Sequence, residues 1–220
     1  MNKETHAFQK LCHSEQSIAA GRVLGRSNGK IESIYIVKDG LLSVTVPLSS
    51  GGEVATAMIG PGGVAGAMSA FGCPYWFNTV LAQTAGSVWV VNRSDFTAAV
   101  RDDASLQKTA FQHEMWISLQ AQQAAACNAV HPLPARMSTW LLTAQDLTGW
   151  KEFHFTHEYI SEMLGAQRVS ISNAAIEMRQ KGLIEYRRGN VSVQDRSGLE
   201  GEACECYLAT KAAHHEIFRW

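Results

Sequence analysis

The side chains whose types and spacing could do chemistry are basic residues gathered between Gly165 and Val191. Five cations and two acids lie in this stretch, which leaves a local balance of +3, although the whole chain carries a net charge of −1. A protein that is nearly neutral overall can therefore still turn a cationic face toward the phosphates of DNA. The cations are Arg168, Arg179, Lys181, Arg187 and Arg188, and the acids are Glu177 and Glu185.

Two short helices around a glycine are expected to position these cations. Thr156 is a suitable N-cap, and Glu158 follows in the first turn, where the helix dipole favours an acid. Gly165 interrupts the pattern after about two turns, and Gly182 is expected just beyond the end of the second helix. The apolar residues at helical spacing are Tyr159, Ile160, Met163 and Leu164 in the first helix, and Val169, Ile171, Ala174, Ala175 and Met178 in the second.

A short β-hairpin is predicted directly after the second helix. Residues 183–184 and 191–193 are rich in β-branched side chains, and the turn sequence Arg188-Gly189-Asn190 separates them. Two helices joined by a turn form the helix-turn-helix unit, whose second helix can enter the major groove of DNA. The stretch from residue 155 to residue 193 therefore predicts a DNA-binding unit with a hairpin wing.

The composition is that of an ordinary globular protein of one or two domains. Of the 220 residues, 46% are apolar and 18% are charged, which argues against disorder. Five scattered cysteines and a polar N-terminus indicate reduced thiols and a cytoplasmic location. No charged residue occurs from Val54 to Asn92, but Pro61, Pro74 and six glycines interrupt that stretch. We therefore expect buried sheet there and no membrane segment.

A series of short β-rich segments precedes the helical half of the chain. The clearest lie at residues 34–37, 41–46, 54–59, 79–81 and 87–91, and Lys38-Asp39-Gly40 predicts a hairpin between the first two. About six to eight strands at such spacing predict an antiparallel barrel or a jelly-roll-like sandwich. Ahead of them, residues 1–20 are expected to hold a short helix with Phe8, Leu11 and Ile18 facing inward.

A long helix is predicted from Ala104 to about Ala129, because this stretch contains neither proline nor glycine. The helix is apolar on more than one side, so it must pack against its own domain and against another surface. A second copy of the chain is the economical partner, and burial within one chain is the alternative.

Two prolines, Pro132 and Pro134, end the long helix and mark a hinge between two domains. Another helix is expected over residues 135–147, directly ahead of the helix-turn-helix. Ser197 and Glu200 have the spacing of a capping box, which predicts the start of a last helix after the wing.

This order of elements resembles the Crp/Fnr family of bacterial transcription regulators over nearly the whole chain. The most specific matches are YIVKDG at residues 35–40, Arg136 with WLL at 140–142, and LGAQRVS at 164–170. The resemblance implies an α+β protein with an N-terminal antiparallel, jelly-roll-like β-roll, a long dimerisation helix and a C-terminal winged helix-turn-helix.

The resemblance also implies how the domains divide the function. Residues 1–103 would form the β-roll sensor, 104–130 the dimerisation helix and hinge, and 131–220 the DNA-binding domain. Such a protein is a transcription regulator rather than an enzyme. Its expected partners are a second copy of itself, a two-fold-related site in double-stranded DNA, and RNA polymerase.

The contacts to DNA are carried over residue by residue onto a recognition helix of about residues 167–181. Arg168 matches the family arginine at the start of that helix, where a guanidinium can bind guanine O6 and N7 or a phosphate. The next family position is commonly glutamate; here it is Val169, which can touch a thymine methyl but cannot accept from cytosine N4. A further family arginine falls on Asn173, which could pair with adenine. The candidate DNA-binding residues are Gln167, Arg168, Val169, Ser170, Ser172, Asn173 and Arg188.

The sensor domain departs further from the family pattern. Members that bind cyclic nucleotides use a Gly-Glu pair for the ribose and an Arg-Ser/Thr pair for the phosphate. The corresponding stretches here are residues 66–68 and 77–79, and they offer no cation for a buried phosphate. Ordinary cyclic AMP binding is therefore not expected. The aromatic run Tyr75-Trp76-Phe77 could line an apolar effector pocket, or these side chains could fill the vacated space themselves.

Catalytic and metal chemistry find less support in the sequence. No histidine lies between His13 and His113, so the strands cannot assemble the ligand set of a cupin-type enzyme. Cys12 stands alone near the N-terminus, which argues against an iron–sulfur cluster of the family type. No nucleophile–base pair stands out either. We expect no catalytic residues, no cofactor and no metal.

Cysteines near the end of the chain and at the end of the long helix raise two further possibilities. Cys204 and Cys206, with His214 and His215 nearby, could bind a metal, but residues two apart on a helix point about 200° apart. Cys127 is a candidate redox thiol that gates DNA binding, and its alternative is a small buried hydrophobe.

Overall fold

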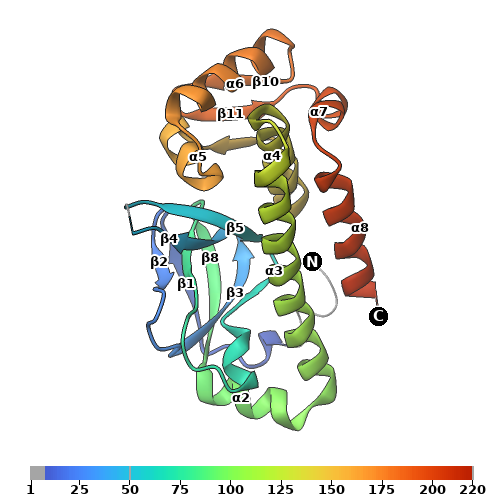
Figure 1. Cartoon of the computed structure of the whole chain (residues 1–220). Coiled ribbons are helices and arrows are strands. Elements are labelled where there is room, and N and C mark those ends of the chain that lie inside the picture. Colours follow the sequence, from blue (N-terminus) through green and yellow to red (C-terminus); the bar gives the residue numbers. More distant parts are fainter. Residues whose placement is uncertain (1–7, 50, 220) are drawn as a thin grey trace.

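The computed structural model describes residues 8–49 and 51–219 and has the predicted α+β architecture (Figure 1). An antiparallel β-roll lies beside the long helix α3 (Ala104–Val130), and the helix-turn-helix lies above one end of the roll (Figure 1). A last helix, α8 (Cys206–Arg219), runs back along α3. The α+β fold class with a roll, a long helix and a C-terminal winged helix-turn-helix is confirmed.

The described strands of the roll form two four-stranded antiparallel sheets with orders β1-β8-β3-β6 and β2-β7-β4-β5. Apolar side chains of both sheets meet between them and exclude water, for example Ile34, Val44 and Val80, each 3% exposed or less. The strands are β1 (Ser14–Ile18), β2 (Val23–Gly25), β3 (Ser33–Asp39), β4 (Leu42–Pro47), β5 (Glu53–Ile59), β6 (Val64–Ala65), β7 (Thr79–Ala82) and β8 (Gly86–Asn92).

The N-terminal segment differs from its prediction. Phe8 is fully buried, as expected, and its ring lies 5.1 Å from that of Phe96. Residues 14–18, however, form strand β1, which pairs with β8 and places Ile18 opposite Gly86. The backbone hydrogen bonds offered by the edge of β8 override a weak local preference for helix. Residues 1–7 lie outside the described part of the chain.

The turn at Lys38-Asp39-Gly40 is not a hairpin. Strand β3 pairs with β8 and β6, whereas β4 pairs with β5 and β7, so the turn carries the chain from one sheet to the other. Gly40 adopts a φ of 92°, and Leu41 then binds the opposite loop by donating its N–H to Thr84 Oγ1 at 2.9 Å. A turn therefore forms at the predicted residues, but the packing of the whole roll decides which strands pair with each other.

Helical segments pack beside the roll before the chain continues into the long helix α3. The segment η1 (Ala67–Phe71) and helix α2 (Arg93–Asp102) pack beside each other, and α3 follows after Asp103. The Asp103 carboxylate caps α3 by accepting from the N–H of Ser105 at 2.8 Å. As Figure 1 shows, α3 passes the whole length of the roll and so connects the roll to the helix-turn-helix.

Three faces of α3 have different surroundings. One packs on the roll, where the Gln120 amide bonds both the N–H and the C=O of Met58 at 3.0 Å and so satisfies the edge of β5. A second face packs on α8, where Trp116 stacks edge-on to His214 at 4.7 Å. The third face is turned to solvent and carries a stripe at three- and four-residue spacing: Phe111, Met115, Ser118, Gln122, Ala125 and Ala129.

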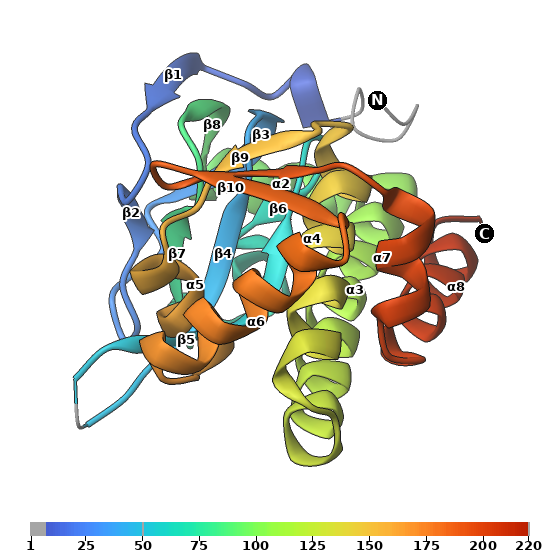
Figure 2. The same cartoon turned by 90° about the horizontal axis from the view of Figure 1, so that it is seen from above.

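The C-terminal part begins with α4 (Leu133–Thr148), two residues earlier than predicted because Pro134 fits the first turn of a helix. A three-stranded wing sheet of order β10-β11-β9 packs behind the helix-turn-helix (Figure 2). The third strand, which follows α4, was not predicted. The elements are β9 (Glu152–His154), α5 (His157–Leu164), α6 (Arg168–Gln180), β10 (Ile184–Arg187), β11 (Asn190–Val193) and α7 (Arg196–Glu202).

The predicted capping box at Ser197 and Glu200 is wrong. Helix α7 begins at Arg196, and its cap is Asp195, which accepts from the N–H of Gly198 at 2.9 Å. Glu200 instead lies 3.0 Å from the Arg196 guanidinium, one turn along the helix. Asp195, two residues before Ser197, is therefore the N-cap instead, since its carboxylate can accept the hydrogen bond of the first turn.

The two halves of the chain touch directly. Leu41 and Met58 of the roll belong to the same buried hydrophobic cluster as residues of the C-terminal part such as Trp140. A Cβ atom on Gly165 would lie 3.3 Å from the Val54 side chain. The helix-turn-helix is thus held against the ends of β4 and β5 by apolar contacts. None of the described helices combines the length and the apolarity that crossing a bilayer requires.

Candidate nucleic-acid interface

Helices α5 and α6 are joined by the turn that the sequence predicted. Thr156 Oγ1 accepts from the N–H of Tyr159 at 3.1 Å and caps α5. Gly165 ends α5 with a φ of 57°, a left-handed conformation that favours glycine. Gly182 ends α6 in the same way, with a φ of 73°. These three residues mark the start of α5 and the ends of both helices.

Helix α6 has one buried face and one free face. Ile171, Ala174, Ala175 and Met178 are each 4% exposed or less and anchor the helix to the core. The opposite face carries five of the predicted DNA-binding residues in exposed positions, and Val169 is 69% exposed. These five are Gln167, Arg168, Val169, Ser170 and Asn173.

The first turn of α6 is also open at the level of the backbone. Gln167 occupies the N-cap position, but its side chain makes no capping hydrogen bond. The amides of a helix N-terminus have no partner within the helix and favour an anion. The first turn of α6 can therefore bind a phosphate beside the Arg168 side chain.

Contacts within the unit hold Arg168 and Ser172 in place. The Arg168 Nε lies 3.5 Å from a Glu158 carboxylate oxygen on α5, with both side chains more than half exposed. Ser172 Oγ donates to the Arg168 carbonyl at 3.0 Å and lies 3.0 Å from His157 Nδ1. Burial, with a smaller effect of the nearby Arg168 charge, lowers the pKa of His157. His157 thus acts as a neutral support for the turn at neutral pH.

The wing presents Arg188 at the tip of a two-residue hairpin. Arg187 pairs with Asn190, and the two residues between them have positive φ, 50° for Arg188 and 83° for Gly189. This is the type I′ geometry that tight hairpins prefer. Asn190 Oδ1 lies 2.7 Å from His154 Nδ1 and ties the wing to β9.

The local positive balance is partly neutralised by ion pairs. Lys181 lies 2.9 Å from carboxylate oxygens of both Glu177 and Glu202, and Arg187 lies 3.2 Å from Glu185. Among the described residues, Arg179 and Arg188 are in no ion pair. The free positive charge of the unit therefore lies at Arg188, at Arg179 and at the weakly paired Arg168.

Comparison with known proteins agrees with this geometry. The model of the Crp-like helix-turn-helix domain matches residues 135–202, and the model of the cyclic nucleotide-binding domain matches residues 15–103, so that together they cover most of the chain. The chain belongs to the Crp/Fnr family. It is a transcription regulator of this type with a helix-turn-helix DNA-binding domain.

Solved structures of family members share the fold at low sequence identity. FixK2 from Bradyrhizobium japonicum superposes with a TM-score of 0.75 at 19% identity, covering 87% of this chain and 97% of that one. TTHB099, a CRP-family transcriptional regulator from Thermus thermophilus, gives 0.71 at 21% identity, with 86% and 96% covered.

The c-di-GMP responsive regulator CLP from Xanthomonas campestris gives a TM-score of 0.70 at 14% identity, with 87% of this chain and 98% of that chain covered. No curated protein matches the sequence of this chain.

Trp76, from the aromatic run that could line an effector pocket, fills interior space of the roll. Trp76 is 8% exposed and its ring lies so close to Gly25 that a Cβ there would be 2.3 Å away. A Cβ on Gly66 would lie 2.9 Å from the same ring. Phe77, by contrast, is 70% exposed, and Tyr75 is 47% exposed. The three aromatics border a cavity of about 70 Å³, but only Trp76 belongs to the core.

An acid from α3 lies at this cavity. Glu114 accepts from the N–H of Met68 at 3.0 Å, and burial raises the pKa of its carboxyl to about 7, against a smaller opposing effect of that hydrogen bond. No lysine, arginine or histidine is among the described residues that line the cavity. The surroundings therefore disfavour a phosphate.

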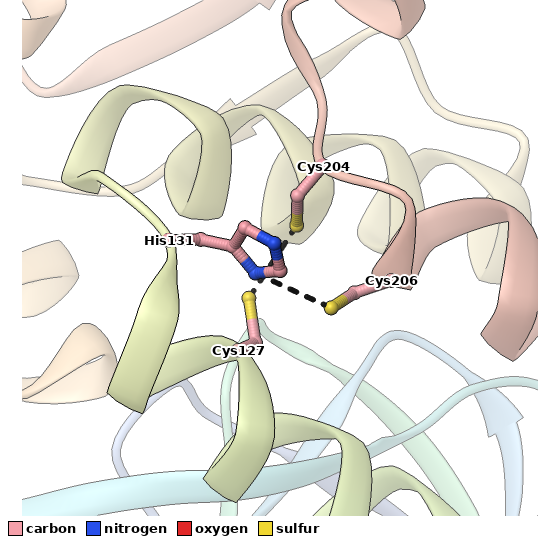
Figure 3. A group of neighbouring side chains, drawn as sticks. All are labelled: Cys127, His131, Cys204 and Cys206. Carbon is pink, nitrogen blue, oxygen red and sulfur yellow. Dashed lines mark hydrogen bonds between the residues drawn. The ribbon is translucent and has the colours of Figure 1, made fainter.

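Cys127, the predicted redox thiol, is buried and has unexpected neighbours. It lies in the last turn of α3, 3.4 Å from Cys204 measured between the sulfur atoms, and His131 and Cys206 complete a group of four (Figure 3). Burial, followed by the neighbouring thiols, raises the pKa of Cys127.

The sequence argument that Cys204 and Cys206 point apart is wrong for this chain. Cys204 lies in the extended link before α8 and only Cys206 is helical, so the helical angle does not apply. Both side chains turn toward Cys127, as Figure 3 shows. His214 is elsewhere, packed on Trp116. The spacing Cys127-x3-His131, one helical turn, is the signal in the sequence that could have paired these two residues, but it does not reveal the two distant cysteines.

Proposed function

We propose that the protein is a homodimeric, sequence-specific regulator whose α6 reads base edges in the major groove and which ordinary cyclic AMP does not control. The observation that carries this proposal is the open N-terminal turn of α6, where Arg168 and Asn173 are exposed on a helix whose other face is buried. Residues 1–103 act as the sensor, 104–130 as the dimer helix and hinge, and 131–220 as the DNA-binding domain.

Each exposed group on α6 has a definite chemical use in this proposal. Arg168 donates two hydrogen bonds to guanine or one to a phosphate, Asn173 pairs with adenine, and Val169 contacts a thymine methyl. Gln167, Ser170 and Ser172 lie beside them within the first two turns, and Arg188 reaches the backbone from the wing. Because Val169 cannot accept a hydrogen bond from cytosine, the preferred site should differ from that of members with glutamate at this position.

Selection of bound sequences from random double-stranded DNA tests the reading of sequence. The expected result is a two-fold-related motif, and Arg168→Ala should weaken binding to it by about 1–3 kcal/mol while relaxing the preference at one position of each half-site. Arg22→Ala, at an exposed arginine of the roll that bonds Gln16, is the matched loss of an arginine and should leave binding unchanged. Equal affinity for all sequences at physiological salt would overturn the proposal.

Dimerisation is supported by the solvent-facing stripe of α3. Phe111 is 53% exposed, and alanines and polar residues follow it at the spacing of a coiled-coil seam. Small side chains at the far end, near the hinge, allow two helices to approach closely. Sedimentation should give a dimer for the wild type and a monomer for Ala125→Glu, whereas Ala212→Glu on exposed α8 should remain dimeric.

Independence from cyclic AMP is supported by the filled roll. Trp76 occupies interior space, and Glu114 adds an acid where a cyclic phosphate would need a cation. Calorimetric titration with cyclic AMP should give no heat of binding beyond dilution, and DNA affinity should be the same with and without it.

A second candidate function is control of DNA binding by oxidation of Cys127, favoured by the 3.4 Å approach of Cys204. Burial and the raised pKa of Cys127 make its thiol a slow nucleophile, so this candidate is the weaker one. A change in DNA affinity on oxidation that Cys127→Ser abolishes would support it. Unchanged affinity would leave the protein without a thiol switch.

A further inference from the structure

We propose that Cys127, His131, Cys204 and Cys206 form a tetrahedral zinc site that joins the end of α3 to the start of α8. All four candidate ligand atoms lie within 4.8 Å of one another. Three sulfurs and one imidazole nitrogen are a common ligand set of structural zinc. This proposal reverses the expectation from sequence that the chain holds no metal, and it does not depend on the DNA-binding function.

The distances within the group match those around a single ion. Two sulfurs bound tetrahedrally at about 2.3 Å from zinc are about 3.8 Å apart, and a sulfur and an imidazole nitrogen about 3.6 Å. Cys127 and Cys204 are separated by 3.4 Å between sulfurs, and Cys206 Sγ lies 3.5 Å from His131 Nδ1. Small side-chain adjustments therefore suffice to place all four atoms on one ion.

Hydrogen bonds around the group orient the ligands as a metal site requires. His131 directs Nδ1 to the sulfurs, and its Nε2 lies 3.1 Å from a Glu205 carboxylate oxygen, which fixes the tautomer with Nδ1 free to bind. The Gln123 amide donates to Cys206 Sγ at 3.0 Å, and Thr139 Oγ1 lies 3.2 Å from Cys204 Sγ. Such donors stabilise thiolates.

Burial favours a closed site over a catalytic one. The three cysteines are each 7% exposed or less, and the His131 side chain is 16% exposed. Four protein ligands leave no open position for water or substrate. On binding, each of the three thiols loses its proton to solvent and bonds the ion through Sγ, so no oxidant or reductant is needed.

The location of the four ligands gives the site a structural role. Cys127 and His131 lie one turn apart at the hinge end of α3, whereas Cys204 and Cys206 flank the link into α8 (Figure 3). Both of these cysteines lie beyond residue 202, where the match to the family's helix-turn-helix model ends. A bound ion would hold α8 to the hinge between sensor and DNA-binding domain.

Access to the site is available from the junction of the two halves. A cavity of about 110 Å³ reaches the cluster, and Cys127 and Cys206 lie on its wall beside residues of β5, α4 and α5. A metal ion or a chelator can therefore reach the sulfurs without global unfolding.

Zinc binding by the reduced full-length protein tests the proposal. Elemental analysis after loading with Zn²⁺ and desalting should give one ion per chain, and Co²⁺ in its place should give the intense absorption of tetrahedral cobalt thiolate. Cys204→Ser and Cys206→Ser should each lose the ion. Cys12→Ser and Cys73→Ser, which remove thiols outside the cluster, are matched controls and should keep it.

A variant that keeps all four ligands separates metal binding from folding. Glu205→Gln, at an exposed carboxylate, should weaken zinc affinity in competition with a chelator by about 10- to 100-fold, while circular dichroism stays unchanged. The proposal is overturned if the reduced, folded wild type retains no zinc. It is equally overturned if the cluster variants retain as much zinc as Cys12→Ser.

Discussion

The free face of α6 and the interior of the β-roll show how differently two parts of one molecule encode function. On α6 the candidate DNA-contacting groups are exposed side chains such as Arg168 and Asn173. Their chemistry can be inferred without knowing which distant residues lie near them. In the roll, the same kind of reading fails, because Trp76 and Phe77 are adjacent in sequence but only Trp76 is in the core. What an exposed side chain can bind follows from its residue type, whereas which side chains fill the interior follows from packing. Four substitutions, three of them with a matched control variant, test this contrast.

The largest effect is expected for Trp76→Ala in the roll. The buried ring fills the space between Gly25 and Gly66, so its removal should lower the free energy of unfolding by about 3–5 kcal/mol. Phe77→Ala removes a ring that is 70% exposed and should change stability by no more than about 0.5 kcal/mol. Urea unfolding of both variants measures these changes. Similar losses of unfolding free energy would mean that both rings contribute to the core.

Glu114→Gln should alter the pH dependence of stability. In the folded protein the Glu114 pKa is raised from 4.5 to about 7, so the folded state binds the proton more tightly than the unfolded state. Stability from this group is therefore full below about pH 4.5 and is lost as the pH rises toward 7, by roughly 3 kcal/mol.

The glutamine keeps an acceptor for the N–H of Met68 but cannot ionise. Unfolding free energies measured at pH 5 and pH 8 should thus fall less for the variant than for the wild type. Parallel pH profiles of the two proteins would count against a buried, proton-sensitive acid in the roll.

Val169→Glu should change sequence preference rather than stability. Val169 is 69% exposed, so the substitution costs little folding energy, but a carboxylate can accept from cytosine N4. Selected DNA sites should shift toward cytosine at one position of each half-site, with a discrimination of about 1–3 kcal/mol. Ile176→Glu, farther along the same helix and 47% exposed, is the control. An identical shift in the selected sites for this variant would show that the change does not come from a contact made by residue 169.

The smallest effect is expected for Thr156→Ala, which removes the cap of α5. Loss of the hydrogen bond from the N–H of Tyr159 to Thr156 Oγ1 should cost about 1 kcal/mol of unfolding free energy. Thr156→Ser retains the hydroxyl and should restore most of it. If both variants were equally destabilised, the side-chain methyl rather than the cap would be what holds the turn.

The sequence by itself determined the elements that depend on neighbours within a few residues. Thr156, Gly165 and Gly182 bound the helix-turn-helix as expected, because caps and left-handed glycines act through hydrogen bonds to residues at most four or five positions away. The type I′ turn at Arg188 and Gly189 is another local feature. Periodicity identified the buried face of α6 except at Val169, which was expected among its apolar residues but is 69% exposed. The candidate DNA-facing residues of α6 came from the family resemblance.

Only the tertiary structure decided the features that join distant parts of the chain. The turn at Gly40 changes sheets instead of closing a hairpin, because β3 finds β8 and β4 finds β7. Cys127 meets Cys204 across 77 positions of sequence. No local rule predicts such a meeting, since it results from α8 folding back along α3. The free energy that brings these sulfurs together comes from burial of the two helices against each other, not from the cysteines themselves.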